Sequence, residues 1–377
     1  MPSAPFAYRV TGGTSPGTLL DARTIGVQLW EKKMLAVIEK LEEAINFHDF
    51  KTRASLGDVY EQMLNDLRGA GNAGEFYTPR AITAFMADRV NPRLDSRETV
   101  MDPACGTGGF LTAAIDHFRN QLTTKSSAED KRAIEDLIHG IEKKQLPHLL
   151  CTTNMLLHGI DVPSQIEHKN TLGIGWNEWS ANDKVDCIIT NPPFGGYEDD
   201  GVGNDYPADL RTRETADMFM ALIIKKLLKE NGRAAVVLPD NVLFEGGAGE
   251  TIRKKLMHEC DLHTLLRLPT GLFYAQGVKA NVLFFDKKPA SEKPWTQKLW
   301  IYDLRTNKHF TLKTNPLRRA DLDEFVDLYK VGKRHERAET WSADTPDGRW
   351  RVYSYDELVA RDKTSLDIFW LKDESLA

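Results

Sequence analysis

Short apolar runs alternate with amphipathic stretches over residues 75–286. This alternation predicts an α/β fold with a doubly wound, parallel sheet. The runs are a few residues long and rich in β-branched side chains, which is typical of buried strands. We expect strands at residues 99–101, 137–141, 185–190, 234–238, 262–268, 282–285 and 298–304. We expect helices at residues 110–118, 146–157, 216–228 and 319–329, and a polar loop at 123–132.

The hydrophobic pattern divides the chain into three parts. Residues 1–25 are rich in Gly, Ser, Thr and Pro without periodicity, which indicates a flexible or loosely packed terminus. Between residues 30 and 67, apolar side chains recur at spacings of three and four, which predicts helix. We therefore expect a flexible N-terminus with a shortened helical domain over 1–74, the α/β domain over 75–315, and a mixed, partly helical extension over 316–377.

Composition places the chain among ordinary globular proteins. Its 377 residues are 41% hydrophobic and 28% charged, and no apolar run reaches the roughly 18 residues that a membrane span needs. The N-terminus lacks a charged segment followed by an apolar core, so secretion is not indicated. The four cysteines form no CxxC pair, which predicts neither a zinc site nor a disulfide framework and fits a reducing cytoplasm.

The charge balance bears on nucleic-acid binding. The formal net charge is −6, whereas a protein that grips DNA alone usually carries a basic balance, because phosphate neutralisation dominates affinity. We interpret each local basic cluster as a solvated helix face. The clusters are Lys225, Lys226 and Lys229; Arg253, Lys254 and Lys255; Arg318 and Arg319; and Lys333, Arg334 and Arg337. A chain of this charge that acts on DNA is expected to take its grip from a partner.

The tetrapeptide Asn191, Pro192, Pro193 and Phe194 directly follows the predicted strand at 185–190. Neither proline has an N–H to donate, so the strand ends there and the segment is stiff. The Asn side-chain oxygen and a proline carbonyl can each accept one N–H of a planar exocyclic amine. The aromatic ring can stack on the base that carries this amine. The alternative is an ordinary tight turn after a strand, where Asn and Pro are common.

A glycine-rich segment follows the first predicted strand. In open α/β sheets, ligands bind beyond the carboxyl ends of the strands, and glycines there let the backbone approach a ligand closely. The next helix, from Phe110, points its N-terminal dipole at the same place. A generic glycine-rich turn is one alternative, and a dinucleotide site is a weaker one because it needs glycine where Leu111 stands. The residues assigned to this ligand site are Asp102, Gly106, Thr107, Gly108 and Gly109.

Together, these two motifs resemble those of the amino-methyltransferases that use S-adenosylmethionine (SAM). A third segment narrows the resemblance to the modification (M) subunits of Type I restriction–modification systems, which are adenine-N6 DNA methyltransferases. That segment consists of Glu75, Phe76, Tyr77, Thr78, Pro79 and Arg80. By itself it indicates a helix start, with Thr78 as N-cap and Pro79 at the first helical position. The similarity runs from about residue 54 to the C-terminus.

The resemblance implies a Rossmann-like methyltransferase fold, with residues 75–315 as the catalytic domain and SAM as the cofactor. The glycine-rich segment would hold SAM, the segment from Glu75 to Arg80 would pack over its methionine end, and Asn170 would border its adenine. Glu142 ends the second predicted strand, where a carboxylate can accept both hydroxyls of a ribose. From its position alone, Glu142 is more readily explained as an ordinary acid at a strand end.

The implied reaction moves a methyl group from a sulfonium to an exocyclic nitrogen, and it needs alignment more than a strong base. Asn191 and the carbonyl of Pro192 would accept both amine protons and release the nitrogen lone pair. The target base must leave the duplex, and Phe194 would stack on it. Phe273 and Tyr274 would wall the base pocket or, with equal weight, belong to the core.

The resemblance also implies partners. These are double-stranded DNA, a specificity (S) subunit and a restriction (R) subunit, with two M chains for each S and no membrane. Family members usually have a longer helical N-terminal domain and a helical tail that engages S, so we expect this chain to be shortened at both ends. Two other interpretations stay open: an N-methyltransferase for RNA or protein glutamine, and a SAM-binding scaffold subunit without activity.

Overall fold

The computed structural model describes most of the chain beyond residue 77. The described residues are Tyr60, 78–195, Glu198, 201–273, 277–311 and 314–374, and they all belong to one compact unit, Leu56–Ala377. Apart from Tyr60, the predictions for residues 1–74 lie outside the described residues. The predictions for Glu75, Phe76, Tyr77 and Tyr274 lie outside them as well.

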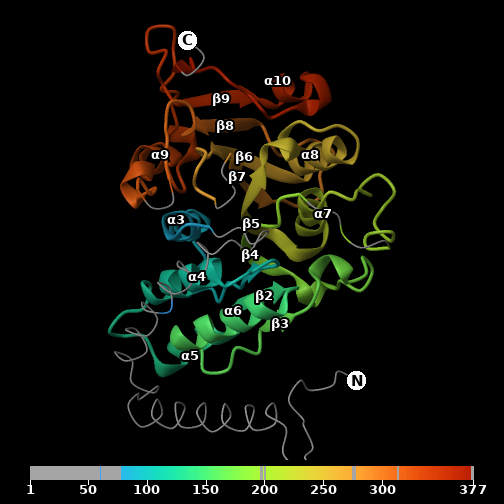
Figure 1. Ribbon diagram of the computed structural model, residues 1–377, viewed down its shortest axis with the longest axis vertical. Coiled ribbons are helices and arrows are strands. Elements are labelled where there is room, and N and C mark those ends of the chain that lie inside the picture. The colour runs from blue at the N-terminus through green and yellow to red at the C-terminus, as the bar shows by residue number, and fades with distance from the viewer. Residues whose placement is uncertain are drawn as a thin grey trace, which may run out of the picture. The chain divides into compact units, whose positions relative to one another are not determined.

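Nine strands form one sheet in the order β3-β2-β1-β4-β5-β7-β6-β8-β9 (Figure 1). The first five in this order run parallel to one another. The predicted α/β, doubly wound fold is therefore confirmed for the described residues. The strands are β1 (Val100–Asp102), β2 (Ile138–Glu142), β3 (Ile166–His168), β4 (Val185–Thr190), β5 (Leu228–Pro239), β6 (Cys260–Arg267), β7 (Ala280–Lys287), β8 (Lys298–Asp303) and β9 (Trp350–Ser354).

The sheet is not parallel throughout, which corrects the expectation. Strand β7 pairs antiparallel with both β5 and β6, and β9 pairs antiparallel with β8. A parallel neighbour needs a long crossover, usually a helix. Between Arg267 and Ala280 the described residues form no helix, so β7 can return only in the opposite direction.

Helices cover both faces of the sheet and define two cores. In one core, helices α3, α4, α5, α6 and α9 pack against one face of the sheet. In the other core, helices α7, α8 and α10 pack against the opposite face. Along β4, Cys187 and Ile189 belong to the first core and Ile188 to the second, as the two-residue period of a strand requires. The helices are α3 (Arg80–Val90), α4 (Gly109–Arg119), α5 (Ala128–Leu137), α6 (Gln145–Leu157), α7 (Thr215–Leu222), α8 (Ala248–Glu259), α9 (Asp323–Tyr329) and α10 (Tyr355–Val359).

Several helix boundaries differ from the sequence prediction, and those of α3, α5 and α7 have clear local causes. Helix α3 has Pro79 as its N-cap residue, and the side chain of Thr78 makes no capping bond. The predicted loop over 123–132 is wrong from Ala128 onward, because a capping box between Ser127 and Asp130 begins α5 there. Helix α7 ends at Leu222 and passes through a π-helical turn into β5, which starts at Leu228.

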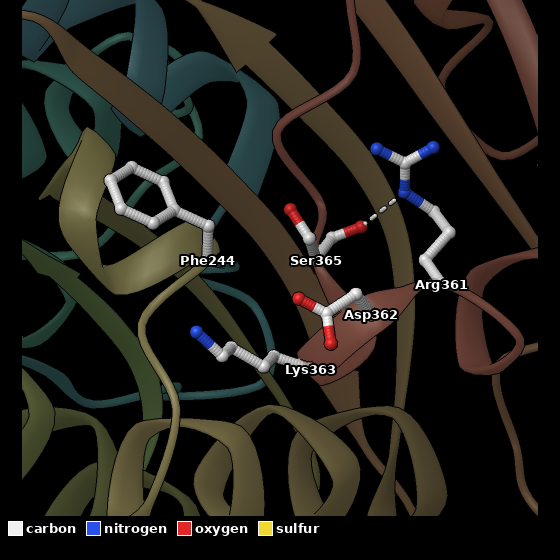
Figure 2. Close-up of a pocket in the computed structure, with 5 residues that line it drawn as sticks. All are labelled: Phe244, Arg361, Asp362, Lys363 and Ser365. Atoms are coloured by element: carbon white, nitrogen blue, oxygen red, sulfur yellow. Dashed lines mark hydrogen bonds between the residues drawn. The ribbon is translucent and has the colours of Figure 1, made fainter.

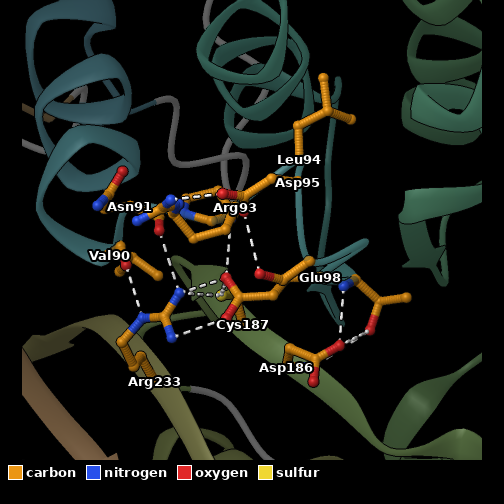
Figure 3. A network of polar contacts seen from close by, with 12 residues as sticks. Val90, Asn91, Arg93, Leu94, Asp95, Glu98, Asp186, Cys187 and Arg233 are labelled. Carbon is orange, nitrogen blue, oxygen red and sulfur yellow. Dashed lines mark hydrogen bonds and ion pairs between the residues drawn. The ribbon is translucent and has the colours of Figure 1, made fainter. Parts of the chain in front are cut away.

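Arg233 in β5 joins α3 to the amino ends of the central strands (Figure 3). Its guanidinium donates to the carbonyls of Val90 and Asn91 at 2.8 and 3.1 Å, and to Glu98 Oε1 at 3.0 Å. Glu98 lies just before β1 and also accepts from the backbone N–H of Arg93 at 2.8 Å. These bonds fix the C-terminal end of α3. Because a helix is rigid, they also fix the position of its first turn, which lies at the carboxyl edge of the sheet.

Candidate active site

Three predicted site residues meet at the carboxyl edge of the sheet. Asp102 ends β1, Glu142 ends β2, and Asn191 follows Thr190, the last residue of β4. Strand β1 lies between β2 and β4, and all three run parallel. Ligands of open α/β sheets bind at such an edge, so the sheet itself brings the two sequence motifs together.

The glycine-rich loop lies against Glu142. The backbone N–H of Gly106 donates to Glu142 Oε2 at 2.9 Å, and the N–H of Lys144 donates to Oε1 at 2.7 Å. Gly106 and Gly108 have φ of 54° and 85°, in the left-handed region that favours glycine. Gly108 is also the N-cap residue of α4, whose first residue is Gly109. The loop therefore needs glycine to turn from β1 into α4 beside the carboxylate.

Helix α6 packs against the glycine-rich loop at Thr107 and Gly108. A Cβ atom on Gly108 would stand 2.8 Å from Cys151 Sγ and 3.0 Å from Met155 Cε, closer than real side chains allow. The buried side chain of Asn154 donates from Nδ2 to the carbonyl of Thr107 at 3.0 Å. Sequence reasoning missed Asn154, because nothing in the local pattern of α6 shows that it meets a loop 47 residues earlier.

A buried hydrogen bond links the end of β1 to the end of β4, next to the tetrapeptide. Thr190 Oγ1 donates to Asp102 Oδ1 at 2.6 Å, and the N–H of Ala104 donates to the same oxygen at 3.1 Å. Asp102 is 1% exposed. Burial raises the pKa of Asp102 to about 7, although both hydrogen bonds favour the carboxylate. The ends of β1 and β4 are thus held together by a group that is costly to ionise.

The Asn191 amide has one occupied end and one unoccupied end. Its Nδ2 donates to Thr78 Oγ1 at 2.9 Å. Its Oδ1 is buried and has no hydrogen-bond partner among the described residues. A buried acceptor without a donor costs about 1–3 kcal/mol. The site therefore presents an oriented acceptor that a ligand donor can satisfy.

The rest of the tetrapeptide is held from the side. Thr215 Oγ1, at the start of α7, lies 3.1 Å from the carbonyl oxygen of Pro193 and 3.2 Å from that of Gly195. Pro192 is buried and Phe194 is partly buried. The rings of Phe194 and Phe273 meet edge to face with centroids 5.6 Å apart, and Phe273 is 1% exposed. Phe273 thus belongs to the core and also supports the aromatic ring of the motif.

Asn170 contacts a residue that the sequence analysis did not single out. Its Nδ2 donates to Glu198 Oε2 at 2.9 Å, and its Oδ1 accepts from the N–H of Leu172 at 3.2 Å. Glu198 also accepts from Lys143 Nζ at 2.8 Å. The chain after Phe194 therefore reaches the ends of β2 and β3. Of the third motif, Arg80 is the exposed first residue of α3.

A surface hollow lies apart from these residues (Figure 2). Its volume is about 450 Å³, and it contains none of the predicted site residues; it is lined by Phe244, Arg361, Asp362, Lys363 and Ser365. Within the part of the chain that the structure describes, no group of three or more His, Cys, Asp or Glu side chains could hold a metal ion. Nor is any helix there both long and apolar enough to cross a membrane.

Two arginines of the basic clusters are not solvated, contrary to expectation. Arg253 is buried and donates to the carbonyls of Val242 at 2.8 Å and Lys363 at 2.7 Å. Arg337 is buried too, and its Nε donates to the carbonyl of Tyr329 at 2.7 Å. Arg337 also donates to the carbonyl of His263 at 3.2 Å, so both guanidiniums join segments that are distant in the sequence. Periodicity along one helix does not reveal such contacts.

The profile of the N-6 DNA methylase family matches residues 51–351. The chain belongs to this family. The methylase subunit of the Type I restriction enzyme EcoEI from Escherichia coli is 47% identical over 336 residues, which cover 88% of this chain and 64% of that protein. The resemblance to Type I modification subunits is confirmed by this similarity.

Solved structures agree with this assignment. The M protein of the Type I restriction enzyme EcoKI is 35% identical with a TM-score of 0.69, and the match covers 79% of the present chain and 67% of the EcoKI chain. A chain from a Type I restriction–modification complex is 30% identical with a TM-score of 0.75, covering 88% and 66%. The present chain therefore spans about two thirds of the length of these relatives. The predicted methyltransferase fold is confirmed.

Proposed function

We propose that this chain is a methyltransferase subunit that transfers a methyl group from SAM to N6 of adenine in double-stranded DNA, within a Type I restriction–modification complex. The observation that carries the proposal is the buried, unpartnered Oδ1 of Asn191. It lies after β4, on the sheet edge that also holds Asp102 and Glu142. A ligand donor is needed there, and the exocyclic amine of adenine is such a donor.

The residues present fit SAM. The space where a Cβ atom of Gly106 would stand is open, so a ligand can approach the backbone there. Both oxygens of Glu142 accept backbone N–H groups and keep further lone pairs for two ribose hydroxyls. SAM, when bound, supplies a methyl group on a positively charged sulfur. We assign its binding to the glycine loop (Gly106, Thr107, Gly108 and Gly109), Asp102, Glu142, Asn170 and the segment from Glu75 to Arg80, in which the hydroxyl of Thr78 is bound by Asn191 instead.

The tetrapeptide would prepare the adenine amine to attack the methyl group of SAM. Asn191 Oδ1 accepts one amine hydrogen and the Pro192 carbonyl accepts the other, which frees the nitrogen lone pair from the ring. Phe194, supported by Phe273, stacks on the flipped base. Alignment of two reactants of this kind can lower a barrier by about 7–11 kcal/mol.

The partners follow from charge and family. A chain with a net charge of −6 has little attraction for a polyanion, so we assign the DNA grip to an S subunit. We further propose two M chains for each S, an R subunit in the complete enzyme, and a cytoplasmic location. The relatives are named as subunits of Type I restriction enzymes, which supports a complex of this kind.

The decisive experiment is transfer of radiolabelled methyl groups from SAM to genomic DNA that lacks adenine methylation. We expect label in N6-methyladenine when the cognate S subunit is present and none when it is omitted. Absence of label on DNA, together with measurable SAM binding, would contradict the proposal. RNA and protein substrates would then be tested next.

A second prediction separates chemistry from cofactor binding. Asn191→Ala and Phe194→Ala should each abolish methyl transfer, because they remove the acceptor or the stacking surface for the target base. SAM affinity, measured by calorimetry, should survive in both variants. Comparable loss of SAM binding in Asn191→Ala would show that this residue serves the cofactor instead. Thr345→Val, in an exposed loop, is the control for preparation.

A further inference from the structure

The tetrapeptide loop is held by hydroxyl groups from two helices on opposite faces of the sheet. Thr78 lies just before α3, which packs in one core, and Thr215 is the first residue of α7, which packs in the other. They are 6% and 5% exposed. Thr78 Oγ1 meets Asn191 Nδ2 at 2.9 Å. Thr215 Oγ1 lies 3.1 Å from the Pro193 carbonyl oxygen.

The bond to Thr78 decides which end of the Asn191 amide faces the site. An amide has an acceptor oxygen at one end and a donor nitrogen at the other, and a half-turn of the group exchanges them. With Nδ2 on Thr78, the free end is Oδ1. A turned amide would point its N–H donors at the exocyclic amine. The amine is itself a donor, because its lone pair is delocalised into the ring, so no hydrogen bond would form. Without the hydroxyl, Nδ2 would be a buried donor with no acceptor, and the amide would turn or tilt to find one.

The bond to Thr215 acts on the main chain of the loop. Two successive prolines leave the loop without the N–H donors that normally fasten a backbone. Its carbonyl oxygens can still accept hydrogen bonds, and Thr215 Oγ1 lies within hydrogen-bond distance of those of Pro193 and Gly195. Because Pro192 precedes this anchored carbonyl by one residue, the direction of the Pro192 carbonyl depends on it.

We infer that Thr78 and Thr215 are positioning residues for methyl transfer. Thr78 orients the Asn191 amide, and Thr215 sets the direction of the loop carbonyls. This inference rests on the proposed function. It departs from the assignment of Thr78 to the cofactor that the sequence motif implies, since its hydroxyl oxygen is engaged by Asn191. Rigid support strengthens it, because the far end of α3 is fixed by Arg233.

The test compares Thr78→Val with Thr78→Ser in the complex with S. Valine has nearly the shape of threonine but no hydroxyl, whereas serine keeps the hydroxyl. We expect Thr78→Val to lower kcat by about 10- to 100-fold, the effect of a small misplacement of a reacting group. KM for DNA and the Kd for SAM should change little. Thr78→Ser should restore most of kcat.

The same comparison applies to Thr215. We expect Thr215→Val to lower kcat and Thr215→Ser to recover it, again with SAM affinity preserved. In the double valine variant the losses should be less than multiplicative, because both hydroxyls hold one loop. Thermal unfolding of each variant establishes that the fold is intact, and Thr345→Val serves as the exposed control.

Two results would overturn the inference. If Thr78→Val weakens SAM binding while kcat at saturating SAM is unchanged, Thr78 is a cofactor ligand. If both valine variants keep full kcat, the hydroxyls do not position the loop. Either result requires a wild-type complex that methylates DNA. An inactive wild-type complex with measurable SAM binding would instead contradict the proposed function. Failure of this inference can therefore be distinguished from failure of the proposed function.

Discussion

Single residues of the candidate site differ in how far their hydrogen-bonding capacity is met. The acceptor Oδ1 of Asn191 is buried without a hydrogen-bond partner among the described residues, whereas the donor Nδ2 is bound by Thr78, 113 residues earlier. Asp102 differs from Asn191, since it is tied to Thr190 and buried almost completely. Burial raises the pKa of its carboxyl group to about 7, so the stability of the fold should depend on pH.

We predict that Asp102→Asn stabilises the protein increasingly as the pH rises. Burial raises the pKa of Asp102 to about 7, whereas an unfolded Asp has a pKa of about 3.9. The unfolded chain therefore loses its proton first, and the wild-type fold loses stability between about pH 4 and pH 7. Each unit of pKa difference corresponds to about 1.4 kcal/mol. Asparagine does not ionise and escapes this loss.

Urea unfolding at pH 5, 6, 7 and 8 checks this prediction. The difference in unfolding free energy between Asp102→Asn and wild type should grow from pH 5 to about pH 7 and then level off. A difference that is the same at every pH would show that Asp102 is already ionised in the fold at pH 5.

Elements begin and end where local chemistry meets tertiary contacts. Ser127 and Asp130 start α5 by a capping box that sequence alone contains. The start of α4 is different, because Gly108 is its N-cap residue and also packs against Cys151 and Met155 of α6. Two glycines in one loop thus have different reasons to be glycine.

We predict that Gly108→Ala destabilises the protein more than Gly106→Ala. Both residues have positive φ, so alanine costs about 1–2 kcal/mol at either position. Only at Gly108 would the added methyl group meet Cys151 and Met155, and such overpacking costs about 1–3 kcal/mol more. Chemical unfolding measures both variants. Equal losses would mean that α6 yields to the methyl group without strain.

At the scale of the whole molecule, the C-terminal segments complete the sheet and are fastened to its carboxyl edge. Strand β9 adds to β8 at the edge of the sheet. Arg253 binds the carbonyls of Lys363 and Thr364, and the buried Arg267 binds the carbonyl of Ile368 at 2.5 Å. Two buried arginines therefore hold residues 363–368 against the rest of the fold.

We predict that Arg253→Met destabilises the protein by about 3 kcal/mol or more. The arginine is 2% exposed and donates to four backbone carbonyls, which methionine would leave unpaired. Lys254→Met is the matched control, because Lys254 forms an exposed pair with Glu250 worth less than about 1 kcal/mol. Urea unfolding and proteolysis of residues 361–374 measure the effect. Similar results for both variants would contradict a clamping role for Arg253.

The sequence by itself determined most of the strands, though not β3 or β9, together with the carboxyl-edge motifs and the family. Strand β4 has the predicted bounds, and Asp102, Glu142 and Asn191 stand at strand ends as expected. These features are readable because hydrophobic periodicity and turn chemistry depend on neighbours a few residues apart. The parallel order of β2, β1 and β4 then brings the motifs to one edge.

Only the tertiary structure decided the partners of the side chains and the direction of β7. Thr78 contacts Asn191 across 113 residues, and Thr190 contacts Asp102 across 88. The burial of Arg253 depends on a segment 110 residues later. No local pattern encodes such meetings, because they arise when distant elements pack and each buried polar group must find a partner. The tertiary structure thus sets how the motifs that the sequence contains are oriented for chemistry.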